Sequence, residues 1–123
     1  MSQPYSYSET QSVDLDNYEI VLFMQHGCHF CHHFDPKLRE FAKALNISVG
    51  VFTLDGQGDD AFPGATPARE DIVDAMFSDL GVATPTTFLL NKKTNNVELI
   101  AQGDMNMPEF QQRLNRAMVE LEE

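Results

Sequence analysis

The fold is decided by residues 21–38, which read VLFMQHGCHFCHHFDPKL. The continuous apolar run at residues 20–24 has the length and pattern of a strand that is covered on both faces. Residues 26–27 interrupt it, and Cys28 opens an amphipathic helical stretch that extends to about residue 45. Pro36 removes a backbone donor inside that helix, so we expect a kink there. The stretch therefore predicts a strand, a short turn, and a helix with Cys28 at its start and Cys31 one turn inside.

Further elements follow toward the C-terminus. Strands are predicted at residues 49–54, 86–90 and 97–101, the last two forming a hairpin across the polar turn 91–96. One helix is expected to begin at Thr66, as N-cap before Pro67, and to stop at Gly81, and another runs from about residue 107. Residues 55–69 read as a long surface loop. Residues 1–17 form an N-terminal arm, in which residues 1–12 are expected to be loose or to form a short helix. Residues 18–123 form a single α/β domain, a mixed four-stranded sheet with helices on both faces.

Composition narrows the classes of function. The 123 residues are 42% hydrophobic, which fits a globular protein, and the formal net charge of −11 opposes binding to nucleic acid or anionic membranes. No apolar run approaches the ~20 residues that span a bilayer, so no membrane insertion is expected. The start of the chain shows no signal peptide, which leaves a cytosolic protein or a mature exported form. Two cysteines exclude a disulfide framework.

The motif Cys28-His29-Phe30-Cys31 is typical of thiol-disulfide chemistry when it joins a strand to a helix. The helix N-terminus stabilises a thiolate, so we expect the pKa of Cys28 to lie below the ~8.5 of free cysteine. Cys28, before the first turn, is the expected exposed nucleophile, and Cys31 the covered resolving thiol. His26 and His29 flank Cys28 closely enough to shift its pKa. The alternative is a pair of inert thiols or a structural disulfide.

Two cofactor hypotheses compete at the same place. The sequence C-x-x-C-H, ending at His32, also matches covalent haem attachment, with Met105 or Met107 as second axial ligand. That hypothesis conflicts with the predicted strands, because such small cytochromes are all helical.

Zinc could be held by Cys28 and Cys31 with histidines, since all four histidines lie close by: His26, His29, His32 and His33. These donors all come from one turn and its flanks, so we interpret His32 and His33 as solvated helix surface. Three acids of the 55–69 loop fail the calcium-loop spacing and are expected to be solvated: Asp55, Asp59 and Asp60.

The order of strand, Cys28-x-x-Cys31, proline-containing helix and Thr84-Pro85 before a hairpin resembles the thioredoxin fold over about residues 18–121. The resemblance implies that Pro85 is cis and lies beside the sulfurs, and that the backbone of Thr84 pairs with a bound substrate. An ordinary turn is the alternative at this position. The chain departs from thioredoxins at Leu22, where they carry a buried acid that serves the resolving thiol.

Three segments are similar to the TrbB family, the disulfide isomerases of F-type conjugative transfer systems. They are residues 21–38, LDGQGDDAFPGATP at 54–67 and VATPTTFLLNKKT at 82–94. The resemblance implies a periplasmic isomerase or reductase, its signal peptide removed, that acts on disulfides of exported conjugation and pilus-assembly proteins. We expect no cofactor other than the redox-active Cys28–Cys31 disulfide, protein substrates with disulfides, and a further thiol-redox partner.

In the expected mechanism, the Cys28 thiolate attacks a substrate disulfide, and either another substrate thiol or Cys31 then releases it. Thr84 and Pro85 hold the substrate backbone, and an apolar surface around Phe30 accepts unfolded segments. Two alternatives stay open. One is a cytosolic thioredoxin-type reductase that uses the same residues, and the other is a non-catalytic binding module on this fold.

Overall fold

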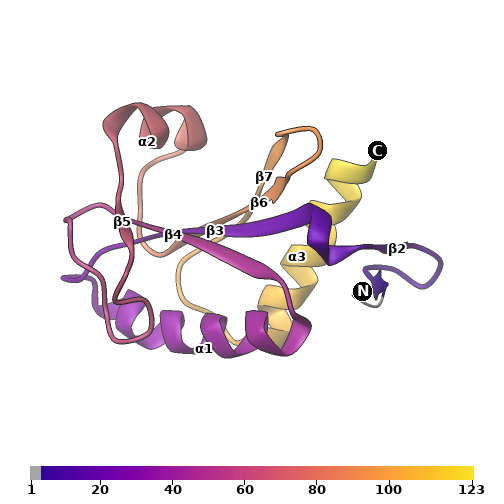
Figure 1. Ribbon diagram of the computed structural model, residues 1–123, viewed down its shortest axis with the longest axis horizontal. Coiled ribbons are helices and arrows are strands. Elements are labelled where there is room, and N and C mark those ends of the chain that lie inside the picture. The colour runs from indigo at the N-terminus through magenta and orange to yellow at the C-terminus, as the bar shows by residue number, and fades with distance from the viewer. Residues whose placement is uncertain (1–3) are drawn as a thin grey trace.

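The computed structural model of the protein describes residues 4–123 and contains one main sheet with helices on both faces (Figure 1). The strand order is β5-β4-β3-β6-β7. Its strands are β3 (Tyr18–Met24), β4 (Ser48–Thr53), β5 (Thr66–Pro67), β6 (Thr86–Asn91) and β7 (Val97–Gln102). β4 runs parallel to both β3 and β5, whereas β6 runs antiparallel to β3 and β7. The mixed α/β architecture is confirmed, but the sheet has five strands instead of the predicted four.

Three helices cover the two faces of this sheet: α1 (His29–Leu45), α2 (Glu70–Phe77) and α3 (Met107–Glu122). Alternation along β3 divides the core, because successive side chains of a strand point to opposite faces. Ile20, Leu22 and Met24 pack with the buried residues of α1 and α3. Val21 and Phe23 pack on the other face with α2, where Phe23 lies edge-on to Phe77 at 5.1 Å. The continuous apolar run therefore reads as a central strand covered on both sides.

The predicted start of the second helix is wrong. Thr66 and Pro67 form β5, which pairs in parallel with Phe52 and Thr53, and α2 begins only at Glu70 after Arg69. A proline is compatible with this place because an edge strand leaves some of its donors unpaired. The helix also ends earlier than Gly81, since Ser78 takes a φ of 51° directly after Phe77.

The described part of the N-terminal arm packs against the domain, and residues 4–12 are neither loose nor helical, contrary to expectation. β1 (Tyr5–Ser6) and β2 (Ser12–Val13) pair antiparallel, and the 3-10 helix η1 (Leu15–Asn17) leads into β3. The Tyr5 hydroxyl donates to Asn115 Oδ1 of α3 at 2.7 Å, and Tyr7 is buried in the core. Residues 1–3 of the predicted arm lie outside the described residues.

The β1–β2 hairpin and the end of α3 lie on the same side of the molecule, at the right of Figure 1, while α1 begins at the opposite side. Within residues 4–123, no helix has both the length and the apolar character needed to cross a lipid bilayer.

Candidate active site around Cys28 and Cys31

β3 carries the chain to the candidate site. The strand ends at Met24, and Cys28 follows as the N-cap of α1 with extended backbone angles. Its Sγ atom accepts a hydrogen bond from the backbone N–H of Cys31 at 3.1 Å. The sulfur therefore occupies the position that a serine or aspartate oxygen takes in an ordinary capped helix, where unpaired N–H groups favour a negative charge.

Cys28 and Cys31 form a disulfide with a Cα–Cα distance of 5.2 Å. Cys31 is fully buried in the core with Phe34 and Leu38, whereas Cys28 is half-buried. The predicted difference in burial between the two thiols is present, although Cys28 is less exposed than expected. A sulfur atom of an incoming molecule can thus reach one side of the disulfide only.

The segment before β6 lies against the disulfide. The Thr84–Pro85 peptide bond is cis, and the carbonyl oxygen of Thr84 lies 3.5 Å from Cys28 Sγ. Pro85 is buried, and its carbonyl accepts the backbone N–H of Gly103 at 2.8 Å. The fold therefore brings Thr84, which is half-buried, beside the nucleophile candidate, while the Pro85 carbonyl is engaged with the segment after β7.

The loop after β4 holds the turn before Cys28. Asp55 accepts the backbone N–H groups of His26 and Gly27, one on each carboxylate oxygen and both at 3.0 Å. These two bonds, led by that of Gly27, lower the pKa of Asp55 against the effect of desolvation. The His26 ring nitrogen Nδ1 lies 2.8 Å from the Gly58 carbonyl of the same loop. In Figure 1 this loop descends from the sheet to the start of α1. Asp55 is exposed as expected, and in addition it holds the backbone of the turn at residues 26–27.

The histidines around the motif are exposed and point to different partners. His29 lies against the Phe30 ring, and His32 Nε2 contacts the His26 carbonyl. His33 pairs with Asp104, which also accepts Lys37. Within residues 4–123, no three His, Cys, Asp or Glu side chains gather as a group that could hold a metal ion. The haem hypothesis required an all-helical chain, and the five-stranded sheet contradicts it.

Two buried acids near the motif were not predicted. Asp35 is fully buried on α1, one turn after Cys31, and Asp59 of the loop is 6% exposed, so the expectation that Asp59 is solvated is wrong. Desolvation, a hydrogen bond with Asp59 and the charge of Asp59 raise the pKa of Asp35 to about 9. The sequence does carry a signal for Asp35. It lies four residues after Cys31 and three before Leu38, on the buried stripe of the helix.

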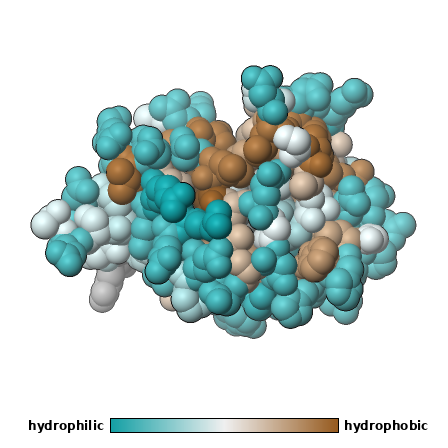
Figure 2. All heavy atoms as spheres, turned by 180° about the vertical axis from the view of Figure 1, so that it is seen from behind, coloured by the Kyte–Doolittle hydropathy of each residue, from teal (hydrophilic) through white to brown (hydrophobic). Residues whose placement is uncertain are grey.

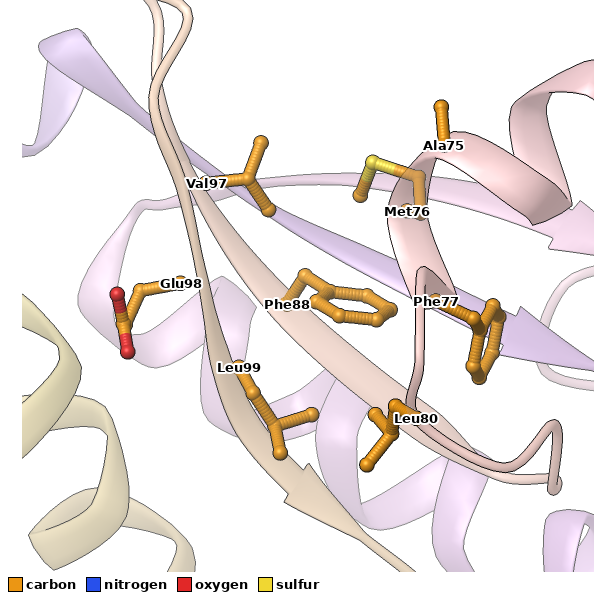
Figure 3. Close-up of a pocket in the computed structure, with 8 residues that line it drawn as sticks. All are labelled: Ala75, Met76, Phe77, Leu80, Phe88, Val97, Glu98 and Leu99. Carbon is orange, nitrogen blue, oxygen red and sulfur yellow. The ribbon is translucent and has the colours of Figure 1, made fainter.

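A separate surface groove of about 370 Å³ lies between α2 and the β6–β7 hairpin (Figure 3). Its lining is mostly apolar and includes Met76, Phe77, Leu80, Phe88 and Leu99. Figure 2 shows apolar side chains gathered along the top of the molecule, where these elements reach the surface. The groove belongs to the α2 face of the sheet, whereas Cys31 packs on the α1 face. It therefore does not form part of the disulfide site.

Comparisons with known proteins agree with this geometry. The family model of TraF, described as F plasmid transfer operon protein, matches residues 14–115. Protein TrbB of Escherichia coli (strain K12) is 40% identical over 114 residues, which are 93% of this chain and 63% of TrbB. The chain thus spans less than two thirds of the length of this curated relative.

Two solved structures are similar in fold. A thiol:disulfide interchange protein of the thioredoxin family from Chlorobium tepidum TLS has a TM-score of 0.60 at 16% identity, covering 83% of this chain and 80% of that one. A thioredoxin-related protein from Neisseria meningitidis serogroup B has a TM-score of 0.56 at 16% identity, covering 95% and 99%. The fold is therefore thioredoxin-like.

Proposed function

This chain belongs to the TraF family, and from that premise we propose that it is a thiol-disulfide oxidoreductase, acting as an isomerase or reductase on exported proteins. The observation that carries the proposal is the Cys28–Cys31 disulfide at the start of α1, with one sulfur half-buried and the other fully buried. The family description, F plasmid transfer operon protein, and the 40% identity to TrbB support a role in conjugative transfer. Pilus-assembly proteins are among the substrates that we propose.

The reduced form begins the reaction. The Cys31 N–H and the helix N-terminus stabilise a thiolate at Cys28, which is the nucleophilic form of cysteine. This thiolate attacks one sulfur of a substrate disulfide, a mixed disulfide with Cys28 forms, and the second substrate sulfur leaves as a thiolate. Isomerisation follows when a different substrate thiolate attacks the mixed disulfide and releases Cys28.

Reduction follows when Cys31 attacks instead. Its thiolate forms a bond to Cys28 Sγ, the bond to the substrate breaks, and the substrate leaves with its sulfur reduced. Because Cys31 is buried, this attack comes only from within the protein, after Cys28 has already bonded to the substrate. The Cys28–Cys31 disulfide then needs a further thiol-redox partner to reduce it, and no other cofactor takes part.

Substrate binding is assigned to the surface beside Cys28. Thr84 offers its backbone for strand-like pairing next to the sulfur, with Pro85 fixing its direction. Phe30 is 60% exposed and gives unfolded substrates an apolar contact. His26 and His29 adjust the ionisation of Cys28 from either side. We place this activity in the periplasm, where disulfides of exported proteins form.

The test uses a protein whose disulfides have been scrambled, incubated with the reduced protein, and the recovery of its native activity is measured. Wild type restores activity, and Cys28→Ser does not. Cys31→Ala accumulates a covalent complex with the scrambled protein, visible on a non-reducing gel, and retains part of the isomerisation because that route needs Cys28 alone. Recovery at the wild-type rate with Cys28→Ser would exclude the proposed function.

Compartment and partner class are tested in cells. Cys31→Ala is introduced into the native gene of a host that carries an F-type transfer system, so that the protein reaches its own compartment. It is then isolated with its covalent complexes, and the attached proteins are identified. Exported transfer proteins are the expected result. Cytosolic proteins on Cys28 would identify the chain as a cytosolic thioredoxin-type reductase, and the lack of any complex would favour a non-catalytic binding module.

A further inference from the structure

Asp35 and Asp59 are buried acids that the mechanism above does not use. Asp35 is fully buried, and in the described part of the chain the Asp59 carboxyl is the one group that can share a hydrogen bond with its oxygens. Asp59 uses Oδ1 to accept the backbone N–H groups of Ala61 and Phe62, at 3.1 and 2.9 Å, while its Oδ2 has no such donor. A buried carboxyl without donors is costly, so the arrangement calls for a physical reason.

The Asp35 and Asp59 carboxyl groups lie within hydrogen-bonding reach of one another. A hydrogen bond between them requires that one group carries a proton, since two carboxylates are both acceptors. Burial and this neighbour raise the pKa of Asp35 to about 9. At neutral pH Asp35 therefore keeps its proton, and two interacting carboxyls in a dry site can share such a proton.

Within residues 4–123, Asp59 is the charged side chain that raises the pKa of Asp35, and β4, which packs beside α1, carries no ionisable residue. The remaining charged groups of the surrounding elements that make side-chain bonds have partners elsewhere: Asp55 with the 26–27 turn, Asp104 with His33 and Lys37, Glu109 with Arg113, and Glu122 with Tyr18.

The pair lies one helical turn from the resolving thiol. Residues four apart on an α-helix lie on the same face, and helical side chains lean toward the N-terminus, so the Asp35 carboxyl lies over the turn that carries Cys31. Cys31 is fully buried, so bulk water does not reach its sulfur. A thiol in this position can release its proton only to a group of the protein or to an internal water.

We propose that Asp35 and Asp59 form a proton relay for Cys31, and this inference rests on the proposed function. As Cys31 attacks the mixed disulfide, its proton passes to Asp35 while the shared proton passes from Asp35 to Asp59. The Cys31 thiolate forms its bond to Cys28 Sγ, and the substrate sulfur leaves with the electron pair of the broken bond. When the Cys28–Cys31 disulfide is reduced again, the relay runs backward and returns a proton to Cys31.

The test separates the two sulfurs in time. Reduced protein is mixed with a nitrophenyl disulfide reagent whose thiolate product is coloured, and release is followed by stopped flow. The first equivalent reports attack by Cys28, and the second reports attack by Cys31 on the mixed disulfide. The leaving thiolate needs no proton, so the second phase depends on deprotonation of Cys31 alone.

Asp35→Asn and Asp59→Asn are each expected to slow the second phase at neutral pH by ~10-fold or more, within the range of general base catalysis, and to leave the first phase near the wild-type rate. Asp59→Asn slows the second phase because Asp35 then has no carboxylate to which it can pass its own proton, and so it cannot accept the proton of Cys31. In both variants the second phase should rise with pH toward the ~8.5 of an unassisted thiol. Asp60→Asn, an exposed neighbour with the same change in charge, is the control and should behave as wild type.

The relay is wrong if the second phase of both variants keeps the wild-type rate and pH profile. If one variant does not fold, the other still decides: a slowed second phase supports the relay, and a wild-type second phase contradicts it. Absence of the first phase in wild type would instead refute the proposed function, because Cys28 would then not be a nucleophile.

Discussion

Asp55 accepts the backbone N–H of Gly27 at 3.0 Å, immediately before Cys28 in the chain. With the matching bond from His26, one carboxylate fixes two successive peptide groups of the turn that leads into α1. Asp55 Oδ1, which accepts the His26 N–H, also accepts the Thr53 hydroxyl at the end of β4, so the turn is tied to the sheet. Since these donors hold the pKa of Asp55 well below its ordinary value, the bonds persist throughout the pH range in which thiols react.

Removal of this anchor should reduce the reactivity of Cys28 without removing any group from it. We expect Asp55→Ala to slow alkylation of Cys28 by about tenfold, because a nucleophile that is no longer held in position reacts less efficiently. The measurement uses a Cys31→Ala background so that one thiol reacts. Asp55→Asn keeps one acceptor oxygen, so its alkylation rate should lie between that of Asp55→Ala and that of the parent. Equal rates in Asp55→Ala and its parent would show that the turn is held by other contacts.

The sulfur of Cys28 also caps α1, so Cys28 has a structural role beside its chemical one, and two substitutions can separate them. Cys28→Ser keeps an oxygen that can accept the Cys31 N–H, whereas Cys28→Ala leaves that donor without its partner. Both variants lack the disulfide, so their difference isolates the cap. We expect Cys28→Ala to be less stable than Cys28→Ser by ~1 kcal/mol in urea unfolding. Equal stability would argue that water replaces the cap.

Asp35 should make the stability of the protein depend on pH in an unusual direction. The fold raises its pKa from 3.8 to about 9, so the folded state keeps a proton that the unfolded chain releases. The associated stability is fully present below about pH 4 and is lost as the pH rises toward about 9.

Asp35→Asn removes that loss. Between pH 5 and pH 8 the stability of Asp35→Asn relative to wild type should increase by more than ~1.4 kcal/mol, the free energy of a single pKa unit. Thermal unfolding across this range, with Asp60→Asn as the control, measures it. A constant difference between Asp35→Asn and wild type would mean that Asp35 is ionised in the folded protein at neutral pH.

Gly58 is required by the loop that holds both Asp55 and Asp59. A Cβ atom at this position would collide with the Phe62 carbonyl oxygen and lie 2.8 Å from that of Pro63, and both are backbone atoms that cannot rotate away. Gly58→Ala is expected to destabilise the protein by ~1–3 kcal/mol. Gly64→Ala in the same loop meets no atom within 4 Å and should change stability by less than ~0.5 kcal/mol. Denaturant unfolding of the two variants compares them directly.

The sequence predicted the elements whose pattern is local. The β3 run, the helix after Cys28 and the hairpin after Pro85 all lie where their apolar periodicity and turn residues place them. β5 was missed because Thr66-Pro67 has the composition of a helix start. Its pairing with the end of β4 depends on a partner strand, and no local pattern reports that contact.

The two cysteines of the candidate site were predicted from the sequence, whereas its two buried acids were not. Cys28 and Cys31 are indicated by their spacing, and Thr84-Pro85 by resemblance. Asp59 sits in a segment rich in glycine and proline that reads as solvated, yet the loop folds back and buries it beside Asp35. The position of Asp35 on the buried stripe of α1 could have indicated a buried acid. Its partner Asp59 lies on another element, so periodicity could not identify it.

The C-terminal end of α3 lies on the side of the molecule opposite the start of α1 (Figure 1). A tag, a fluorophore carrier or a surface tether added after α3 would therefore project away from Cys28. A large protein could approach Cys28 without steric hindrance from such an attachment, which makes the C-terminal side suitable for immobilising the protein in the trapping experiment.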